Sequence, residues 1–145
     1  METNVLPKQA SIPSQKKEVR IFVVDDNLTY LMALGSYLKT NPYYRIYCYR
    51  SGEECIENMN IDPHVVILDY YLNDGTEGLM NGIEILKTIK QMSPDISVII
   101  LSEQKSLEVA VNTLNEGAFT YVPKNKQAFP AVQKTIAHLI AHKTH

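Results

Sequence analysis

The stretch HVVILDYYL, residues 64–72, decides the fold, because four consecutive apolar residues in it lead directly into a carboxylate, Asp69. A run this short and this apolar is typical of a strand that is buried on both faces of a sheet. Asp69 then lies at the carboxyl end of that strand. In open parallel sheets this end of the strands forms the ligand-binding edge, so the stretch predicts a functional carboxylate there.

The same pattern occurs three more times, and each apolar run again ends in polar or charged residues. The further runs are RIFVVDD (20–26), SVIILS (97–102) and FTYVPK (119–124). They end in Asp25 with Asp26, in Ser102 and in Lys124. Because the carboxyl ends of parallel strands share one edge, the sequence predicts three carboxylates, a hydroxyl and an ammonium close together.

Between these runs, apolar residues recur at the three- and four-residue spacing of amphipathic helices. This pattern predicts helices within segments 27–40, 51–59, 83–92, 107–117 and 129–140. Three of the stripes are Leu28, Leu31, Met32, Gly35 and Leu38; Ile83, Leu86, Ile89 and Lys90; and Leu107, Ala110, Val111 and Leu114. A fifth strand is predicted at 43–50, where YYRIYCYR alternates as a more exposed strand does.

Residues that commonly cap helices precede several of these segments. Asp26 or Asn27 can cap the first helix, and Ser106 the fourth. Ser51 is followed three residues later by Glu54, which predicts a capping box. Five strands alternating with five helices predict an α/β domain, a parallel sheet with helices on both faces and right-handed crossovers.

The bulk properties exclude several classes of protein. With 145 residues, 45% of them hydrophobic and 21% charged, the chain fits one globular domain. A formal charge of -2 offers no basic field for nucleic acid or an acidic membrane. No apolar run reaches the length of a membrane span and no signal peptide is evident, so we expect a cytoplasmic protein. Cys48 and Cys55 form no CxxC motif, which argues against a redox pair or a zinc knuckle.

The domain boundaries follow from where the periodicity begins and ends. Residues 1–18 contain two prolines and no periodicity, and we expect a disordered tail there. The folded domain is expected over residues 19–142, with residues 143–145 as a short C-terminal tail.

The predicted cluster has a definite chemistry. Asp25, Asp26 and Asp69 would repel one another, and a hard divalent cation that prefers oxygen ligands, Mg²⁺, relieves that repulsion. Asp69 can then act as a nucleophile on a phosphoryl donor and form an aspartyl phosphate. Lys124 and Ser102 are the groups available to hold the peripheral phosphoryl oxygens.

With these motifs in place, the chain resembles the receiver domain of two-component response regulators over about residues 19–142. The resemblance implies a flavodoxin-like (βα)5 fold, a doubly wound parallel sheet with strand order 2-1-3-4-5. It implies that Asp69 in VVILDYYL is the phosphoacceptor, and that Asp25 and Asp26 in VVDDN hold Mg²⁺.

The resemblance assigns further roles to the residues around the acceptor. The backbone carbonyl of Tyr71 matches a third protein ligand of the metal, and Lys124 in YVPKN matches the phosphate-binding lysine. Ser102 in IILSE matches the switch hydroxyl and Tyr121 the switch aromatic. Tyr71 and Gln104, two positions after the acceptor and the switch residue, are expected to flank the acyl phosphate, where the bulk of Tyr71 slows attack by water.

Two features depart from the family pattern. The connection from Asp69 to Gly82 is longer than in most receivers and lacks their proline. Asn125 follows Lys124 where many receivers have a proline in a cis peptide, and because a non-proline cis bond costs about 3 kcal/mol we expect a trans bond there.

The resemblance implies a signalling protein that takes its phosphoryl group from a histidine kinase or a phosphotransfer protein. Its output surface would be formed by residues 105–124 and the last helix, facing a downstream protein or a second copy of the chain. Catalysis would be limited to Mg²⁺-dependent self-phosphorylation and autodephosphorylation. No direct contact with nucleic acid or membrane is expected.

Other interpretations stay open from the sequence alone. Asp26 can be a helix cap, Ser102 can bond local backbone, and Tyr121 can be a packed sheet residue. The whole chain can be a receiver-like interaction module that works without phosphorylation. A phosphohydrolase using Asp69 is a weaker alternative, since Tyr71 stands where the second aspartate of the DxD type would be.

Overall fold

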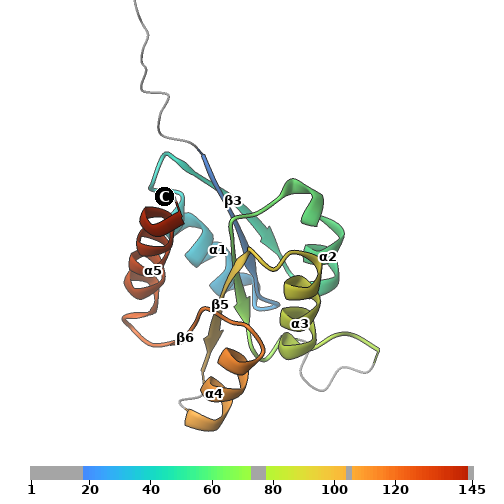
Figure 1. The fold of residues 1–145 in the computed structure, drawn as a ribbon. Helices are drawn as coiled ribbons and strands as arrows, with labels where there is room; N and C mark the ends of the chain where they lie inside the picture. Colours follow the sequence, from blue (N-terminus) through green and yellow to red (C-terminus); the bar gives the residue numbers. More distant parts are fainter. Residues whose placement is uncertain (1–17, 73–77, 104–105, 144–145) are drawn as a thin grey trace, which may run out of the picture.

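The computed structural model describes residues 18–72, 78–103 and 106–143. Within these ranges, strands and helices alternate along the chain (Figure 1). They are β2 (Val19–Val24), α1 (Leu28–Leu38), β3 (Tyr44–Tyr49), α2 (Gly52–Glu57), the 3-10 helix η2 (Met59–Ile61), β4 (Val65–Asp69), α3 (Gly82–Met92), β5 (Ser97–Ser102), α4 (Leu107–Asn115), β6 (Thr120–Pro123) and α5 (Ala128–Lys143). The predicted strands and helices are therefore all present.

The sheet has five parallel strands in the order β3-β2-β4-β5-β6, which confirms the 2-1-3-4-5 order. β4 lies in the middle, with Ile67 paired to Val23 on one side and to Ile99 on the other. All five residues of β4 are buried, as the apolar run predicts. Since every strand runs the same way, the residues that end β2, β4, β5 and β6 meet at one edge.

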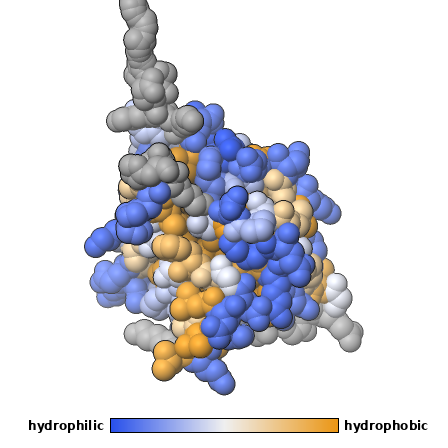
Figure 2. Space-filling view, in the orientation of Figure 1, coloured by the Kyte–Doolittle hydropathy of each residue, from blue (hydrophilic) through white to orange (hydrophobic). Residues whose placement is uncertain are grey.

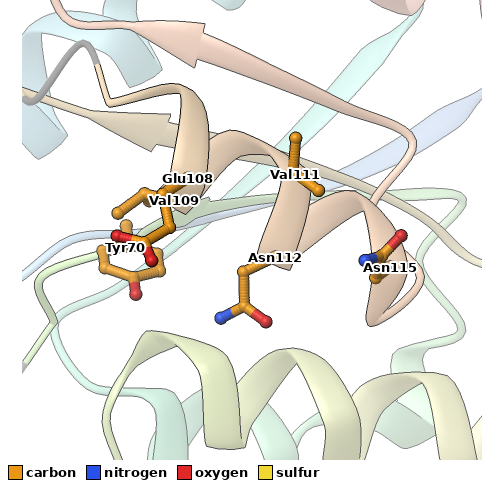
Figure 3. Close-up of a pocket in the computed structure, with 6 residues that line it drawn as sticks. All are labelled: Tyr70, Glu108, Val109, Val111, Asn112 and Asn115. Atoms are coloured by element: carbon orange, nitrogen blue, oxygen red, sulfur yellow. The ribbon is translucent and has the colours of Figure 1, made fainter.

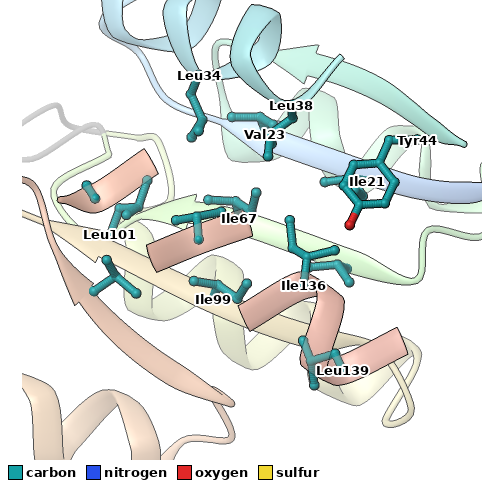
Figure 4. Close-up of a cluster of buried hydrophobic side chains, with 14 of the residues drawn as sticks. Ile21, Val23, Leu34, Leu38, Tyr44, Ile67, Ile99, Leu101, Ile136 and Leu139 are labelled. Carbon is teal, nitrogen blue, oxygen red and sulfur yellow. The ribbon is translucent and has the colours of Figure 1, made fainter. Parts of the chain in front are cut away.

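The sheet divides the core into two layers. α1 and α5 cover one face, where Ile21, Ile67 and Ile136 are fully buried (Figure 4). α2 and α3 cover the other face, where Phe22 and Leu86 are fully buried. Alternate residues of each strand supply the two layers, because successive side chains of a strand point to opposite faces. The strands are thus held from both sides.

The buried arcs of α1 and α3 are rotated from the predicted stripes. In α1 the buried residues are Leu31, Leu34, Gly35 and Leu38, whereas Leu28 and Met32 are about half exposed. In α3, Ile85 is fully buried and Ile83 only partly. Both helices carry more apolar residues than one face can bury, and the periodicity does not say which of them face the sheet.

Lys90, the charged member of the predicted stripe of α3, is partly buried. Its Nζ donates to the carbonyl oxygens of Pro94 at 2.7 Å and Ile96 at 2.8 Å. The stem of the side chain passes beside Gly117. A lysine therefore fits here because its methylenes pack while its ammonium bonds the turn after the helix.

The helix caps that the sequence predicts are present, except that one capping box is incomplete, and a further capping box occurs at α3. Asn27 caps α1, and the hydroxyls of Ser51 and Ser106 accept from Glu54 N and Val109 N. The Glu54 carboxylate accepts from Arg50 N and not from Ser51 N, so the predicted capping box is only half formed. A complete capping box, which the sequence analysis missed, joins Asn81 and Glu84 at the start of α3.

The apolar stripe of α4 lies mainly on the outside of the molecule. Leu107 is 80% exposed, and Val111, Leu114 and the nearby Phe119 are nearly half exposed. Thr113 is the one fully buried residue of this helix, with its hydroxyl on Ala110 O. Figure 2 shows apolar side chains at the α4 end of this face. α4 is therefore held to the sheet through few buried side chains.

Candidate functional site

The carboxyl edge of the sheet brings together the residues that the sequence placed at the strand ends. Asp25 directly follows β2, Asp69 ends β4, Ser102 ends β5, and Lys124 directly follows β6. Backbone hydrogen bonds extend the ladder to this point, from Asp25 N to Tyr49 O at 3.1 Å and from Lys124 N to Ser102 O at 2.8 Å. The positions of these side chains are therefore fixed by the sheet.

Three carboxylates form a compact acidic group. One oxygen from each of Asp25, Asp26 and Asp69 lies within 4.8 Å of the others. Asp25 and Asp69 are buried, with exposures of 2% and 6%, whereas Asp26 is exposed. The group is thus open to solvent on the side of Asp26 and closed on the side of the sheet.

Lys124 bridges two of these carboxylates. Its Nζ donates to Asp25 Oδ2 at 2.9 Å and lies 3.4 Å from Asp69 Oδ1. The lysine side chain is only 10% exposed. The peptide bond from Lys124 to Asn125 is trans, as expected. A single ammonium therefore faces two buried carboxylates.

The charges of the group shift its ionisation. The pKa of the Asp69 carboxyl is raised from 3.8 to about 6, mainly by burial and next by the charge of Asp25, while Lys124 and the Tyr71 N–H act to lower it. Burial lowers the pKa of Lys124, but its hydrogen bond to Asp25 and the charges of Asp69 and Asp25 raise it overall. Among the described residues, Lys124 is the cation whose ion pairs with Asp25 and Asp69 are seen, and one ammonium offsets only part of the charge of these two buried carboxylates.

This donor set fits a hard divalent cation. The group offers oxygen atoms from three carboxylates, and no histidine or cysteine takes part. Oxygen donors of this kind suit Mg²⁺, which also binds phosphate oxygens. The raised pKa of Asp69 indicates that the buried carboxylates are incompletely neutralised by Lys124. The residues present therefore fit the ion that the resemblance implies.

The remaining predicted residues lie around this group. Tyr71 N donates to Asp69 Oδ1 at 3.4 Å, and the Tyr71 ring packs edge-on against Tyr70 at 4.9 Å. Ser102 is fully buried, and Tyr121 is partly buried against the core layer of α2 and α3. Gln104 lies outside the described residues. The structure therefore places Tyr71 beside Asp69 and Ser102 at the end of β5.

Tyr30 is a neighbour of the site that the sequence analysis missed. The centroid of its ring lies 4.3 Å from Lys124 Nζ. Burial raises the pKa of the Tyr30 hydroxyl, with Lys124 opposing and Asp25, Asp69 and Glu103 adding. The sequence contained one usable signal, since Tyr30 stands in the first turn of the helix that directly follows the acidic pair.

Glu53 is a second residue that the sequence analysis missed. It belongs to α2, and its Oε2 accepts from Met80 N at 2.7 Å. Its other carboxylate oxygen is buried and has no hydrogen-bond partner among the residues that the structure describes. Glu53 therefore fixes the end of the long connection between Asp69 and α3.

A second feature is a hollow of about 410 Å³ beside α4, and none of its lining residues belongs to the acidic group. Figure 3 shows Asn112 reaching from α4 toward α3, with Tyr70 at one end of the hollow. The lining residues are Tyr70, Glu108, Val109, Val111, Asn112 and Asn115. With one carboxylate and no basic partner in its lining, this hollow has no evident chemistry, and the acidic group remains the candidate site.

Within the described part of the chain, no helix combines the length and the apolar character that crossing a bilayer requires.

Comparisons with known proteins agree with this geometry. Residues 21–135 match the family model for the response regulator receiver domain. The transcriptional regulatory protein ZraR of Klebsiella oxytoca is 32% identical over 126 residues, which are 87% of this chain and 27% of that protein. The chain thus spans about a quarter of the length of the ZraR relatives that it matches.

Solved structures show the same fold. A CheY-like receiver domain protein from Methanospirillum hungatei superposes with a TM-score of 0.75 at 23% identity, over 88% of this chain and 98% of that one. The signal receiver domain of a putative Luxo repressor protein from Vibrio parahaemolyticus has a TM-score of 0.75 at 27% identity, over 88% and 94% of the two chains.

Proposed function

The chain belongs to the response regulator receiver domain family, and from this premise we propose that it accepts a phosphoryl group on Asp69 and thereby switches a protein-interaction surface. The observation that carries the proposal is the position of Lys124 Nζ between Asp25 and Asp69, at 2.9 Å and 3.4 Å. A buried carboxylate with a cation and two further carboxylates beside it has the groups that phosphoryl transfer to an aspartate requires.

In the proposed reaction, a carboxylate oxygen of Asp69 attacks the phosphorus of the donor. A new O–P bond forms while the bond from phosphorus to the donor breaks, and the leaving group keeps that electron pair. Lys124 and the Ser102 hydroxyl bind peripheral oxygens of the phosphoryl group, because these oxygens carry its negative charge. Ser102 and Tyr121 then adopt the switched arrangement.

Magnesium is part of this proposal. Asp25, Asp26, Asp69 and the backbone carbonyl of Tyr71 are the groups that would hold the ion. When bound, Mg²⁺ stabilises negative charge on the phosphoryl oxygens. Tyr71 also has a second proposed role, in which Tyr71 and Gln104 flank the acyl phosphate and the bulk of Tyr71 slows attack by water.

The proposed donor is a histidine kinase or a phosphotransfer protein, and the proposed output surface is formed by α4, β6 and α5. The exposed apolar side chains of Leu107, Val111 and Leu114 support that assignment, because monomeric proteins rarely leave large apolar patches uncovered. The partner there is a downstream protein or a second copy. We further propose that the protein is cytoplasmic and that its receiver domain extends over residues 19–142.

A phosphate-independent interaction module is the second candidate. It is favoured by one observation, that Lys124 makes its shorter contact with Asp25 and not with the acceptor Asp69. In this alternative the ion pairs only stabilise the fold, and the surface around α4 binds its partner without a switch.

The experiment that separates the two is intact mass spectrometry after incubation with acetyl phosphate, with and without Mg²⁺. We expect the wild type to gain one phosphoryl group only with Mg²⁺, and Asp69→Asn to gain none. Asp95→Asn, an exposed acid that precedes β5 at the other end of the strand, serves as the matched control and should behave as the wild type.

Absence of the adduct on a folded wild type that binds Mg²⁺ would contradict phosphorylation and favour the interaction module. An adduct that persists in Asp69→Asn would contradict the assignment of the acceptor.

A further inference from the structure

We propose that Tyr30 is a positioning residue for Lys124, and that the face of its ring holds the lysine ammonium at the acceptor. The proposal rests on the proposed phosphorylation of Asp69 and adds a residue to that reaction. Its core is one juxtaposition, in which Lys124 Nζ lies 4.3 Å from the centroid of the Tyr30 ring while it contacts Asp25 and Asp69.

A lysine needs such a support because its side chain is long and flexible. Four rotatable bonds separate the ammonium from the backbone, and fixing them has an entropic cost. The two carboxylates attract the charge but restrict its direction weakly, since an ammonium is a compact point charge with three equivalent donors. An aromatic face within about 6 Å adds a further attraction and a wall. With that wall, the ammonium is already in place when a phosphoryl group arrives.

The ring that forms this wall is itself held firmly. Tyr30 N donates to Asn27 Oδ1 at 3.0 Å in the first turn of α1. The ring packs edge-on against Phe129 of α5, with 5.5 Å between the centroids. Phe129 also packs against Tyr37 at 5.4 Å, so α1 and α5 together fix the ring. Lys124 therefore rests on a platform built by two helices.

The hydroxyl of Tyr30 does not explain the contact. It is buried and has no hydrogen-bond partner within residues 18–72, 78–103 and 106–143. What lies next to Lys124 is the ring face, whose negative quadrupole attracts a cation. Tyr30→Phe is therefore a matched control that keeps the face and removes only the hydroxyl.

The competing explanation is that Tyr30 only fills space between α1 and α5. The two explanations differ in what they demand of the residue. Packing requires shape alone, whereas positioning of Lys124 requires a ring with an electron-rich face and an ammonium to act on.

The first test measures the rate constant for phosphorylation by acetyl phosphate with saturating Mg²⁺. We expect Tyr30→Phe to stay within about twofold of the wild type and Tyr30→Leu to lose about fivefold, the change that about 1 kcal/mol of cation–π energy produces. In a Lys124→Gln background, the Tyr30→Leu change should have no further effect, because the ammonium it acts on is gone. A full fivefold loss in that background would overturn the proposal.

The second test replaces residue 30 by phenylalanine carrying one, two or three ring fluorines. Fluorine withdraws charge from the ring face and changes its shape little, so we expect the rate to fall stepwise with each fluorine. The slope should vanish when Lys124 is Gln. Rates that do not change with fluorination would overturn the proposal and leave Tyr30 as a packing residue.

A third test does not depend on phosphorylation. Urea unfolding of the wild type, Tyr30→Leu, Lys124→Gln and the double variant forms a double-mutant cycle on the unmodified protein. We expect a coupling of at least threefold in the unfolding equilibrium constant. If acetyl phosphate fails to modify the wild type, the proposed function fails, and this cycle still decides whether Tyr30 acts on Lys124, with independent effects overturning it.

Discussion

Asp69, the proposed phosphoacceptor, is held in its buried position at an energetic cost. It is almost fully buried beside Asp25, and burial is the main reason that the pKa of its carboxyl is raised to about 6. The single ammonium of Lys124 offsets this only partly, because it also serves Asp25. At neutral pH the folded protein therefore carries a buried negative charge, which protonation would remove and a bound cation would offset.

Asp69→Asn should therefore stabilise the metal-free protein, and the gain should depend on pH. The folded carboxyl holds its proton up to about pH 6, whereas the unfolded one releases it near 3.8. The contribution of Asp69 to the free energy of unfolding thus falls as the pH rises from about 3.8 to about 6, and it stays at this lower level above pH 6. We expect the variant to be about 1–3 kcal/mol more stable at pH 7 and nearly equal to the wild type at pH 4. Urea unfolding in EDTA measures this.

Two controls accompany that experiment. Glu57→Gln, at an exposed acid that ends α2, should leave stability unchanged within about 0.5 kcal/mol at both pH values. Saturating Mg²⁺ should narrow the difference between wild type and Asp69→Asn, since a ligand that binds the folded state stabilises it. A variant that is less stable than the wild type at pH 7 would contradict the electrostatic account of Asp69.

The positions of most residues of the candidate site could be predicted because these residues directly follow or end predicted strands. Apolar runs mark where Asp25, Asp69, Ser102 and Lys124 leave the sheet, and parallel strands bring their ends to one edge. Tyr30 and Glu53 had no comparable signal. Both lie on helices, where contact with the site depends on the rotation of the helix about its axis, and sequence periodicity alone did not fix that rotation for α1.

At the scale of elements, the junction between the end of β4 and the start of α3 fixes the backbone around Asp69, the proposed acceptor. Glu53 of α2 binds Met80 N, and the capping box of Asn81 and Glu84 starts α3 directly afterwards. Gly82, the first residue of α3, packs against the backbone carbonyls of Asp69 and Tyr70. The start of α3 and the end of β4 are therefore in direct backbone contact.

Gly82→Ala should disturb both stability and phosphorylation. An added Cβ would meet the Tyr70 carbonyl and would lie 2.8 Å from Asp69 O, and backbone atoms cannot move aside as a flexible side chain does. We expect a loss of about 1–3 kcal/mol, typical of overpacking, in the free energy of unfolding. We also expect slower phosphorylation, because the shift occurs at Asp69 itself. Urea midpoints and intact-mass kinetics measure the two effects.

Gln91→Ala is the matched control on α3, since Gln91 is exposed and alanine favours helix. It should change neither quantity. Full wild-type stability in Gly82→Ala would show that the junction between β4 and α3 adapts more easily than its contacts indicate.

The elements themselves were predicted better than the orientation of their side chains. Strand positions follow from short apolar runs, and helix starts follow from Asn27, Ser51 and Ser106. The prediction that Leu28 and Met32 of α1 face the sheet was wrong, since both side chains are about half exposed. α1 carries more apolar residues than the sheet can cover, so the sequence pattern alone does not show which of them are buried. Which face is buried is decided by the neighbouring helix, which the sequence does not identify.

At the scale of the whole molecule, α4 contributes less to the buried core than the other helices do. Most of the buried side chains come from the strands and from the helices α1, α2, α3 and α5. α4 contributes Thr113 and presents Leu107, Val111 and Leu114 outward. A helix held this loosely can shift at low cost, and its apolar face gains stability once another surface covers it.

Phosphorylation should therefore promote self-association through α4, and Leu107→Lys should prevent it. Leu107 is 80% exposed, so this change should leave the monomer as stable as the wild type within about 0.5 kcal/mol. Sedimentation equilibrium with and without acetyl phosphate and Mg²⁺ measures the association. Leu28→Lys, at an exposed apolar residue of α1, is the matched control and should still associate. A phosphorylated wild type that stays monomeric at high micromolar concentration would contradict self-association through α4. The exposed apolar side chains of α4 would then indicate that this face binds a different protein.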